Sequence, residues 1–227
     1  MEEIIEGVFH WTAIHPNTGS EAGCHFVGGS GTAIDPLLPD EGIEWFDEHG
    51  VERIVLSTRH HLRHAAEIAD RFGCPILCHE SGLYEFESGS TVTGFAFGDR
   101  LADDVVALEM DSISPDDTVL RIERGGGALL FADSVVNRCS LGFVSDRLIG
   151  EDPEAVKEKI LARCRELLDE RAEHLLFAHG DPLVGGGRPA LQAFVNSRAQ
   201  LRRASRRTGA PELGEEGSGT EHKQGAR

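Results

Sequence analysis

The sequence predicts a mixed α/β domain whose elements fit a four-layer αββα sandwich, with two sheets packed face to face and helices outside each. Three observations carry this prediction. A meander of short strands opens the chain, a strand–helix–strand unit follows, and a second meander leads into a final helix–strand–helix segment. We place this domain at residues 1–205. Residues 206–227 are rich in Gly, Glu and Ser, so we expect a disordered tail.

The first meander is predicted from alternation and turn residues. Residues 4–11 alternate as in a strand, and residues 24–35 form two strands around a glycine-rich turn. Asp40 is expected to cap a short helix that runs to His49, with Gly50 just beyond its end. The apolar run 53–56 predicts a strand buried on both faces.

That run begins the strand–helix–strand unit. Apolar residues at helical spacing predict a helix over 62–72, ended by Gly73, and a buried strand over 75–78. Strands over 105–110, 118–122 and 128–131 make the second meander. Asp152 and Pro153 mark the start of a helix that runs to about Arg171. A buried strand over 174–177 and a helix near 189–203 complete the domain.

Charge excludes some classes of partner. The net charge is −17, and residues 206–227 hold four acids and four bases, so the whole excess lies on residues 1–205. Binding to nucleic acid or to an anionic membrane needs a basic surface, so we expect neither. Nineteen arginines but only three lysines, with so many acids, resemble proteins of a salt-rich cytoplasm. GC-rich coding explains the arginine bias equally well.

Compartment is predicted from the N-terminus and the cysteines. The acidic opening MEEIIE lacks the basic start of a signal peptide, and no apolar run is long enough for a membrane span. The five cysteines are odd in number and form no Cys-x-x-Cys pair, so a disulfide framework is not expected. We therefore predict a cytoplasmic protein. The sequence indicates no oligomeric state.

Four segments resemble, in order, the motifs of the metallo-β-lactamase superfamily. One is an aspartate after the early hairpin, one a histidine-rich segment between a buried strand and a helix, one a strand ending in aspartate, and one a closing His-Gly pair. They are Ile34-Asp35-Pro36, Thr58-Arg59-His60-His61-Leu62-Arg63-His64, Leu129-Leu130-Phe131-Ala132-Asp133 and Phe177-Ala178-His179-Gly180. This resemblance covers nearly the whole folded length and implies the αββα fold.

The motifs also depart from the family pattern. Arg59 stands where the first ligand histidine belongs, Arg63 where the ligand aspartate belongs, and Ile113 where a further histidine belongs. A normal binuclear centre is therefore not expected. The metal ligands that the resemblance retains are His61, His64, Asp133 and His179.

Two hypotheses on function follow from this degenerate site. In the first, one zinc or iron ion is held by His64, His179 and Asp133, with His61 as fourth ligand or proton carrier, and it hydrolyses an ester, lactone or thioester. Asp133 and His61 are then the catalytic candidates. Arg59 and Arg63 bind an anionic group of a small-molecule substrate. We favour this hypothesis slightly, because four ligand-type residues survive at separate motifs.

In the second hypothesis the protein is a metal-free, non-catalytic anion-binding or scaffold protein of the same fold. Arg59 or Arg63 then pairs with Asp133 or Asp35 in place of the metal, because a buried carboxylate without its metal needs another cation or a proton. Oxygen chemistry at an iron site is a weaker third option.

Several neighbouring residues have plainer interpretations. Asp35 is expected to brace the site loop, His60 not to be a ligand, and Asp116 and Asp117 to be turn residues. Segments 82–100 and 134–150 are the expected pocket walls. Five aromatic residues in them are candidates for an apolar lining: Tyr84, Phe86, Phe95, Phe97 and Phe143.

Overall fold

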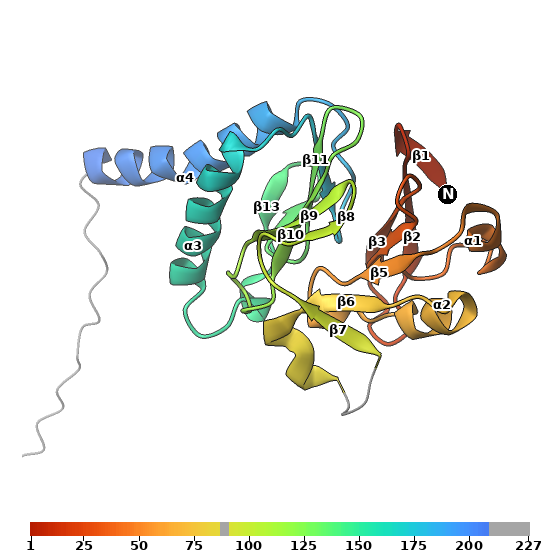
Figure 1. The fold of residues 1–227 in the computed structure, drawn as a ribbon. Coiled ribbons are helices and arrows are strands. Elements are labelled where there is room, and N and C mark those ends of the chain that lie inside the picture. Colours follow the sequence, from red (N-terminus) through yellow and green to blue (C-terminus); the bar gives the residue numbers. More distant parts are fainter. Residues whose placement is uncertain (87–90, 209–227) are drawn as a thin grey trace, which may run out of the picture. The chain divides into compact units, whose positions relative to one another are not determined.

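The computed structural model describes residues 1–86 and 91–208, with the backbone alone from 198 to 208. The chain divides into two compact units, Met1–Val195 and Asn196–Arg227. The first unit contains every strand of the described residues and is drawn as a ribbon in Figure 1. Residues 209–227, most of the predicted disordered tail, lie outside the described residues. No helix of the described part is long and apolar enough to cross a membrane.

The first sheet has seven strands in chain order. Strands β1 to β4 pair antiparallel, and β4 to β7 pair parallel. The predicted strand–helix–strand unit is therefore confirmed as β5, α2 and β6. The strands are β1 Glu2–Ile5, β2 Val8–Ile14, β3 Glu21–Val27, β4 Thr32–Ile34, β5 Arg53–Val55, β6 Ile76–His79 and β7 Val92–Phe95.

The second sheet has five strands in the order β14-β11-β10-β9-β8. Its meander strands pair antiparallel, whereas β11 and β14 pair parallel, as a connection through a helix allows. The strands are β8 Arg100–Ala102, β9 Val105–Glu109, β10 Thr118–Ile122, β11 Ala128–Phe131 and β14 His174–Phe177. A separate hairpin, β12 Val135–Asn137 and β13 Leu141–Phe143, follows β11.

Local signals determine where the helices begin and end. The helices are α1 Glu44–His49, α2 Ala65–Phe72, α3 Pro153–Glu166 and α4 Gly187–Thr208, with short 3₁₀ turns η1 Arg59–His61, η2 Glu80–Glu85, η3 Asp146–Leu148 and η4 Leu167–Asp169. The Asp152 side chain accepts a 3.0 Å hydrogen bond from the Ala155 N–H and caps α3. Gly73 ends α2 at a φ of 64°, a left-handed conformation that glycine adopts without steric cost.

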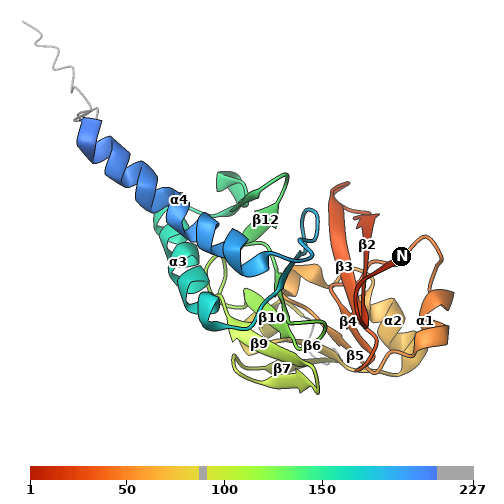
Figure 2. The same cartoon turned by 90° about the horizontal axis from the view of Figure 1, so that it is seen from above.

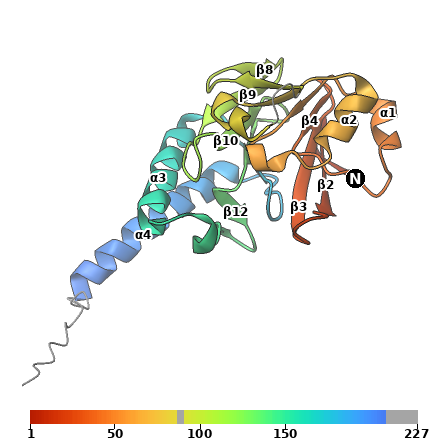
Figure 3. The same cartoon turned by 90° about the horizontal axis from the view of Figure 1, so that it is seen from below.

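Three apolar clusters separate four layers in the first unit. Alternating residues of each strand face opposite sides of its sheet, so Leu130 points between the two sheets while Phe131 packs outward with Ile160 of α3. On the other side, Ile54 packs outward with Phe46 of α1. The predicted αββα sandwich is therefore confirmed, and Figures 2 and 3 show its layers from two further directions.

Some boundaries differ from the prediction. Residues 4–11 belong to two strands rather than one, because the chain turns at Gly7, where φ is 74°. Asp40 does not cap α1. Gly42 instead donates to the Pro39 carbonyl in a turn, and the helix begins after Ile43. At the other end α4 continues to Thr208, through 206–208, which we assigned to the tail.

Candidate functional site

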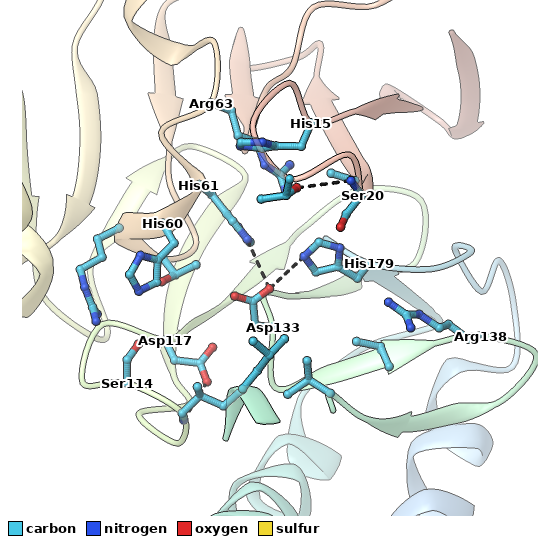
Figure 4. Close-up of a pocket in the computed structure, with 18 residues that line it drawn as sticks. His15, Ser20, His60, His61, Arg63, Ser114, Asp117, Asp133, Arg138 and His179 are labelled. Atoms are coloured by element: carbon cyan, nitrogen blue, oxygen red, sulfur yellow. Dashed lines mark hydrogen bonds and ion pairs between the residues drawn. The ribbon is translucent and has the colours of Figure 1, made fainter. Parts of the chain in front are cut away.

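A pocket of about 680 Å³ opens where the functional motifs meet. Asp35 follows β4, Asp133 follows β11 and His179 follows β14, so each lies at the carboxyl end of a strand with a parallel neighbour. Loops at the same ends of parallel strands lie together, which brings distant parts of the chain to one place. Figure 4 shows the side chains that line the pocket.

His61, Asp133 and His179 converge inside this pocket. The His61 Nε2 lies 3.3 Å from Asp133 Oδ1, and the His179 Nε2 lies 3.1 Å from the same oxygen. One ligand atom from each residue falls within 4.8 Å of the others, close enough for a single metal ion to contact all three. Two imidazoles and one carboxylate form a donor set typical of zinc and of mononuclear iron.

The second nitrogen of each histidine already has a partner. His61 Nδ1 lies 3.0 Å from Asp35 Oδ2, and His179 Nδ1 lies 3.3 Å from the Glu21 carbonyl oxygen. Both partners are acceptors, so Nδ1 of each ring carries the proton and a neutral ring presents its Nε2 lone pair to Asp133. Three electron-rich atoms then face one another. The residues present therefore fit a cation, either a metal ion or a proton.

Asp35 supports His61 from behind. Ser57 donates its backbone N–H to Asp35 Oδ1 at 2.8 Å and its hydroxyl to Oδ2 at 2.5 Å, and both residues are buried. Asp35 has a φ of 49°, a left-handed conformation that aspartate tolerates better than most residues. Asp35 therefore braces the site, as the sequence predicts.

The protonation states follow from this arrangement. Burial alone would lower the pKa of His61, but the carboxylates of Asp35 and Asp133 outweigh burial and raise it to about 9. Burial opposes ionisation of Asp133, yet His61 and His179 hold its pKa well below the ordinary value. Burial likewise opposes ionisation of Asp35, but His61 lowers its pKa. Without a metal, His61 is the cation of the cluster.

His64 stands apart from this group, although the sequence predicts it as a ligand. Its Nδ1 accepts a 2.9 Å hydrogen bond from the Leu38 N–H, and the residue lies just before the first turn of α2. Through this hydrogen bond the ring connects segment 36–38 to the start of α2. The metal-type cluster among the described residues is His61, Asp133 and His179.

Arg59 is engaged by an acid that the sequence analysis assigned to a turn. Its guanidinium forms an ion pair with Asp116, and its backbone N–H donates to the same carboxylate at 2.7 Å. Thr58 adds a 3.1 Å hydrogen bond, and the Asp116 side chain is fully buried. Arg59 lines the pocket, but its charge is balanced within the protein. The expected pairing with Asp133 or Asp35 is not formed.

Arg63 is also committed to the fold. Its Nη1 donates to the backbone oxygens of Asp35 at 2.6 Å and Gly23 at 2.9 Å. It therefore holds a main-chain carbonyl of Asp35 and not the carboxylate. The side chain still lines the pocket beside His15, as Figure 4 shows.

Two residues that line the pocket, Asp117 and Arg138, are not predicted as site residues from the sequence. Asp117 lines the pocket with only 2% of its surface exposed, although a turn residue is expected to face solvent. Arg138, on the loop after β12, lines the opposite wall, is exposed, and forms no ion pair among the described residues. Adjacent acids at 116–117, placed directly before an apolar strand within a metal-motif segment, are the signal that could have identified Asp117.

The predicted walls are half right. Val136, Arg138, Val144 and Leu148, all from segment 134–150, line the pocket. None of the described residues of segment 82–100 does so, and the five candidate aromatics stay outside the lining. Leu83 and Phe86 instead pack against the cluster under α1 and α2.

Solved structures support this fold at low sequence identity. The metallo-β-lactamase DIM-1 matches with a TM-score of 0.67 and 16% identity over 88% of this chain and 96% of that one. A metallo-β-lactamase family protein from Thermus thermophilus matches at 0.59 and 13%, over 92% and 85%. A flavoprotein from Thermotoga maritima matches at 0.57 and 16%, over 83% of this chain and 57% of that one.

The chain therefore has the metallo-β-lactamase fold, as the motif resemblance implies. No family model and no curated protein matches its sequence. The neighbours include proteins described as β-lactamases and one described as a flavoprotein, so the fold alone does not determine the reaction.

Proposed function

We propose that this protein is a hydrolase that binds a single metal ion, zinc or iron, through His61, Asp133 and His179. The observation that carries the proposal is the convergence of three ligand atoms within 4.8 Å in a pocket of about 680 Å³. A metal bound there would lower the pKa of a water molecule and polarise the carbonyl of an ester, lactone or thioester. His64 is left out of this ligand set because it is bonded to Leu38.

The chain's own residues prepare the site for that chemistry. Asp35 holds the His61 ring by its Nδ1, which fixes the tautomer and the direction of Nε2. The Glu21 carbonyl does the same for His179. Ile113, Val136 and Val144 also line the pocket and offer an apolar surface for the rest of a substrate.

The sequence suggested that Arg59 and Arg63 bind an anionic group of the substrate, and we now propose a site in which they do not. Arg59 is paired with Asp116, and the Nη1 of Arg63 is held by backbone oxygens of Asp35 and Gly23, so we assign neither to an anionic group of the substrate. A small-molecule substrate, without nucleic acid or membrane, remains the partner we propose. A cytoplasmic location is proposed with it, since Cys24, Cys74, Cys78, Cys139 and Cys164 are all free thiols.

Metal content tests this function directly. Protein purified without a His-tag is analysed by elemental mass spectrometry, beside Asp133→Ala, His179→Ala and the control His60→Ala. His60 is exposed and adjacent to the cluster but outside it, so its loss should change nothing. We expect about one metal ion per chain in the wild type and the control, and much less in the two cluster variants. Equal metal content in all four proteins would refute the ligand set.

A second candidate function, a metal-free binding or scaffold protein, is favoured by one observation. His61 lies between two carboxylates, and its pKa of about 9 lets a proton replace the metal at neutral pH. Wild-type protein that takes up no zinc or iron even after reconstitution would support this candidate over the hydrolase.

A further inference from the structure

Asp117 is a buried acid whose second oxygen has no partner. It lies in the loop between β9 and β10, and its Oδ2 accepts hydrogen bonds from the Ser134 hydroxyl and, at 3.4 Å, from the Ile113 N–H. Its Oδ1 is buried and accepts no hydrogen bond. The residue lines the pocket beside Asp133 (Figure 4), but Oδ1 itself is covered, so a turn of the carboxyl group must bring this oxygen to the pocket before it meets a substrate.

The surroundings of Asp117 favour its uncharged form. Asp133 and Asp116 are the neighbouring acids, the buried thiol of Cys164 faces it from α3, and no cation of the described residues pairs with it. Arg59 is already paired with Asp116. Burial, strengthened by the charge of Asp133 and only partly opposed by the Ser134 hydrogen bond, raises the pKa of Asp117 to about 7.

We propose that Asp117 holds a proton on Oδ1 and donates it to the leaving-group oxygen of an acyl substrate, as the catalytic acid of the pocket. The position of the proton follows from the hydrogen bonds, since Oδ2 already accepts two and Oδ1 is free. This inference rests on the proposed hydrolase function and adds to it a residue outside the metal cluster.

The proton transfer can be written in full for an ester. The bond between the acyl carbon and the leaving oxygen breaks, its electron pair stays on that oxygen, and the Asp117 proton moves there to form the alcohol. Solvent water supplies the new oxygen on the acyl carbon. One proton of this water restores the Asp117 acid, and the other passes to solvent as the product carboxylate forms.

Leaving-group dependence tests the proposal. The nitrophenolate group of a p-nitrophenyl ester leaves without being protonated, whereas the alkoxide of an alkyl ester needs a proton to leave. General acid catalysis of such a step typically raises the rate roughly 100-fold or more. We therefore expect Asp117→Asn to lower kcat/KM at least about 100-fold for an alkyl ester and less than about 10-fold for the nitrophenyl ester. Metal content should be unchanged. Equal losses on both esters, or loss of the metal, would overturn the proposal.

Two further measurements test the role of Asp117 independently of the activity of Asp117→Asn. Ser134→Ala removes the hydrogen bond that lowers the pKa of Asp117, so the alkaline limb of the pH profile should shift to higher pH, even if Asp117→Asn fails to fold. The infrared difference between wild type and Asp117→Asn should contain a protonated carboxyl band that disappears around pH 7. An unshifted limb or an absent band contradicts the proposal. Wild-type protein inactive on every ester overturns the hydrolase itself, whereas the outcomes above overturn only the role of Asp117.

Discussion

At the scale of single residues, the site depends on a histidine held between two carboxylates. His61 contacts Asp35 at 3.0 Å and Asp133 at 3.3 Å and is itself only 5% exposed. Such a ring can hold a proton at Nε2, and the metal ion that we propose would compete with this proton for the same nitrogen and the same carboxylate. The proposed metal binding is therefore expected to depend on pH through this one side chain.

Stability of the metal-free protein should depend on pH through His61. Its pKa rises from 6.5 to about 9 on folding, so its contribution is complete below pH 6.5 and is lost as pH rises through 9. The full difference is at most about 3 kcal/mol, shared with the two carboxylates. Urea unfolding at pH 6.5 and 9.5 should show a larger loss for wild type than for His61→Gln. The exposed neighbour variant His60→Gln should behave as wild type, and identical losses in all three would contradict the assignment.

Asp35 should tune metal affinity without touching the metal. In Asp35→Asn the amide keeps the Ser57 N–H bond and tolerates the φ of 49°, but it no longer offers a carboxylate to His61. Loss of such a supporting group typically weakens metal binding 10–100-fold, roughly the change we expect in a competition titration against a chelating dye. The control Asp40→Asn removes an exposed carboxylate and should leave the affinity unchanged.

At the scale of elements, ion pairs and close backbone contacts hold the loops of the site in place. The Arg59–Asp116 pair joins η1 to the loop before β10, two segments 57 residues apart in the chain. A hydrogen bond of 2.8 Å from the Gly23 N–H to the Ala178 oxygen joins β3 to the loop after β14. These connections fix the segments that carry His61 and His179.

Breaking the Arg59–Asp116 pair on one side should cost more than removing both charges. Arg59→Met leaves a fully buried carboxylate without its cation, which typically costs about 3–5 kcal/mol. We expect the double variant Arg59→Met, Asp116→Asn to lose less stability in urea unfolding than Arg59→Met alone, and therefore less than the sum of the single variants. Arg147→Met, at an exposed position, is the control. Strictly additive losses would indicate that the pair is not coupled.

Gly23 should tolerate no side chain. A Cβ built at this position lies 2.5 Å from the Phe177 carbonyl oxygen, so Gly23→Ala must push β3 away from the end of β14. His179 follows that strand, and the predicted result is lower stability together with weaker metal binding. Gly142→Ala, where a Cβ meets no atom within 4 Å, is the matched control. Unchanged metal affinity in Gly23→Ala would show that metal binding does not depend on the close contact between β3 and β14.

At the scale of the whole molecule, charge is the dominant feature. The net charge of −17 implies self-repulsion in the compact state, which salt screens. We expect the free energy of unfolding to rise between low salt and molar KCl. An equal rise in NaCl would show that the stabilisation comes from charge screening and not from specific binding of K⁺. A constant or falling value would remove the hypothesis of a salt-rich cytoplasm.

Much of the fold could be predicted from the chain itself, because it depends on local pattern. The short apolar run at β5, the spacing of apolar residues in α2, and Asp152 before Pro153 each encode an element within a few residues. Motif order then added the αββα arrangement. His61, Asp133 and His179 followed from the same motifs, since each stands directly after or near a strand end.

Only the tertiary structure decided which partner each polar side chain contacts. Whether His64 faces a metal or the Leu38 N–H, whether Arg59 pairs with Asp133 or Asp116, and whether Asp117 is exposed or buried all depend on residues far away in sequence. Residue type shows that a side chain can ligate or form an ion pair. Only packing brings a partner within about 3 Å, and hydrogen bonds and ion pairs act only at that range.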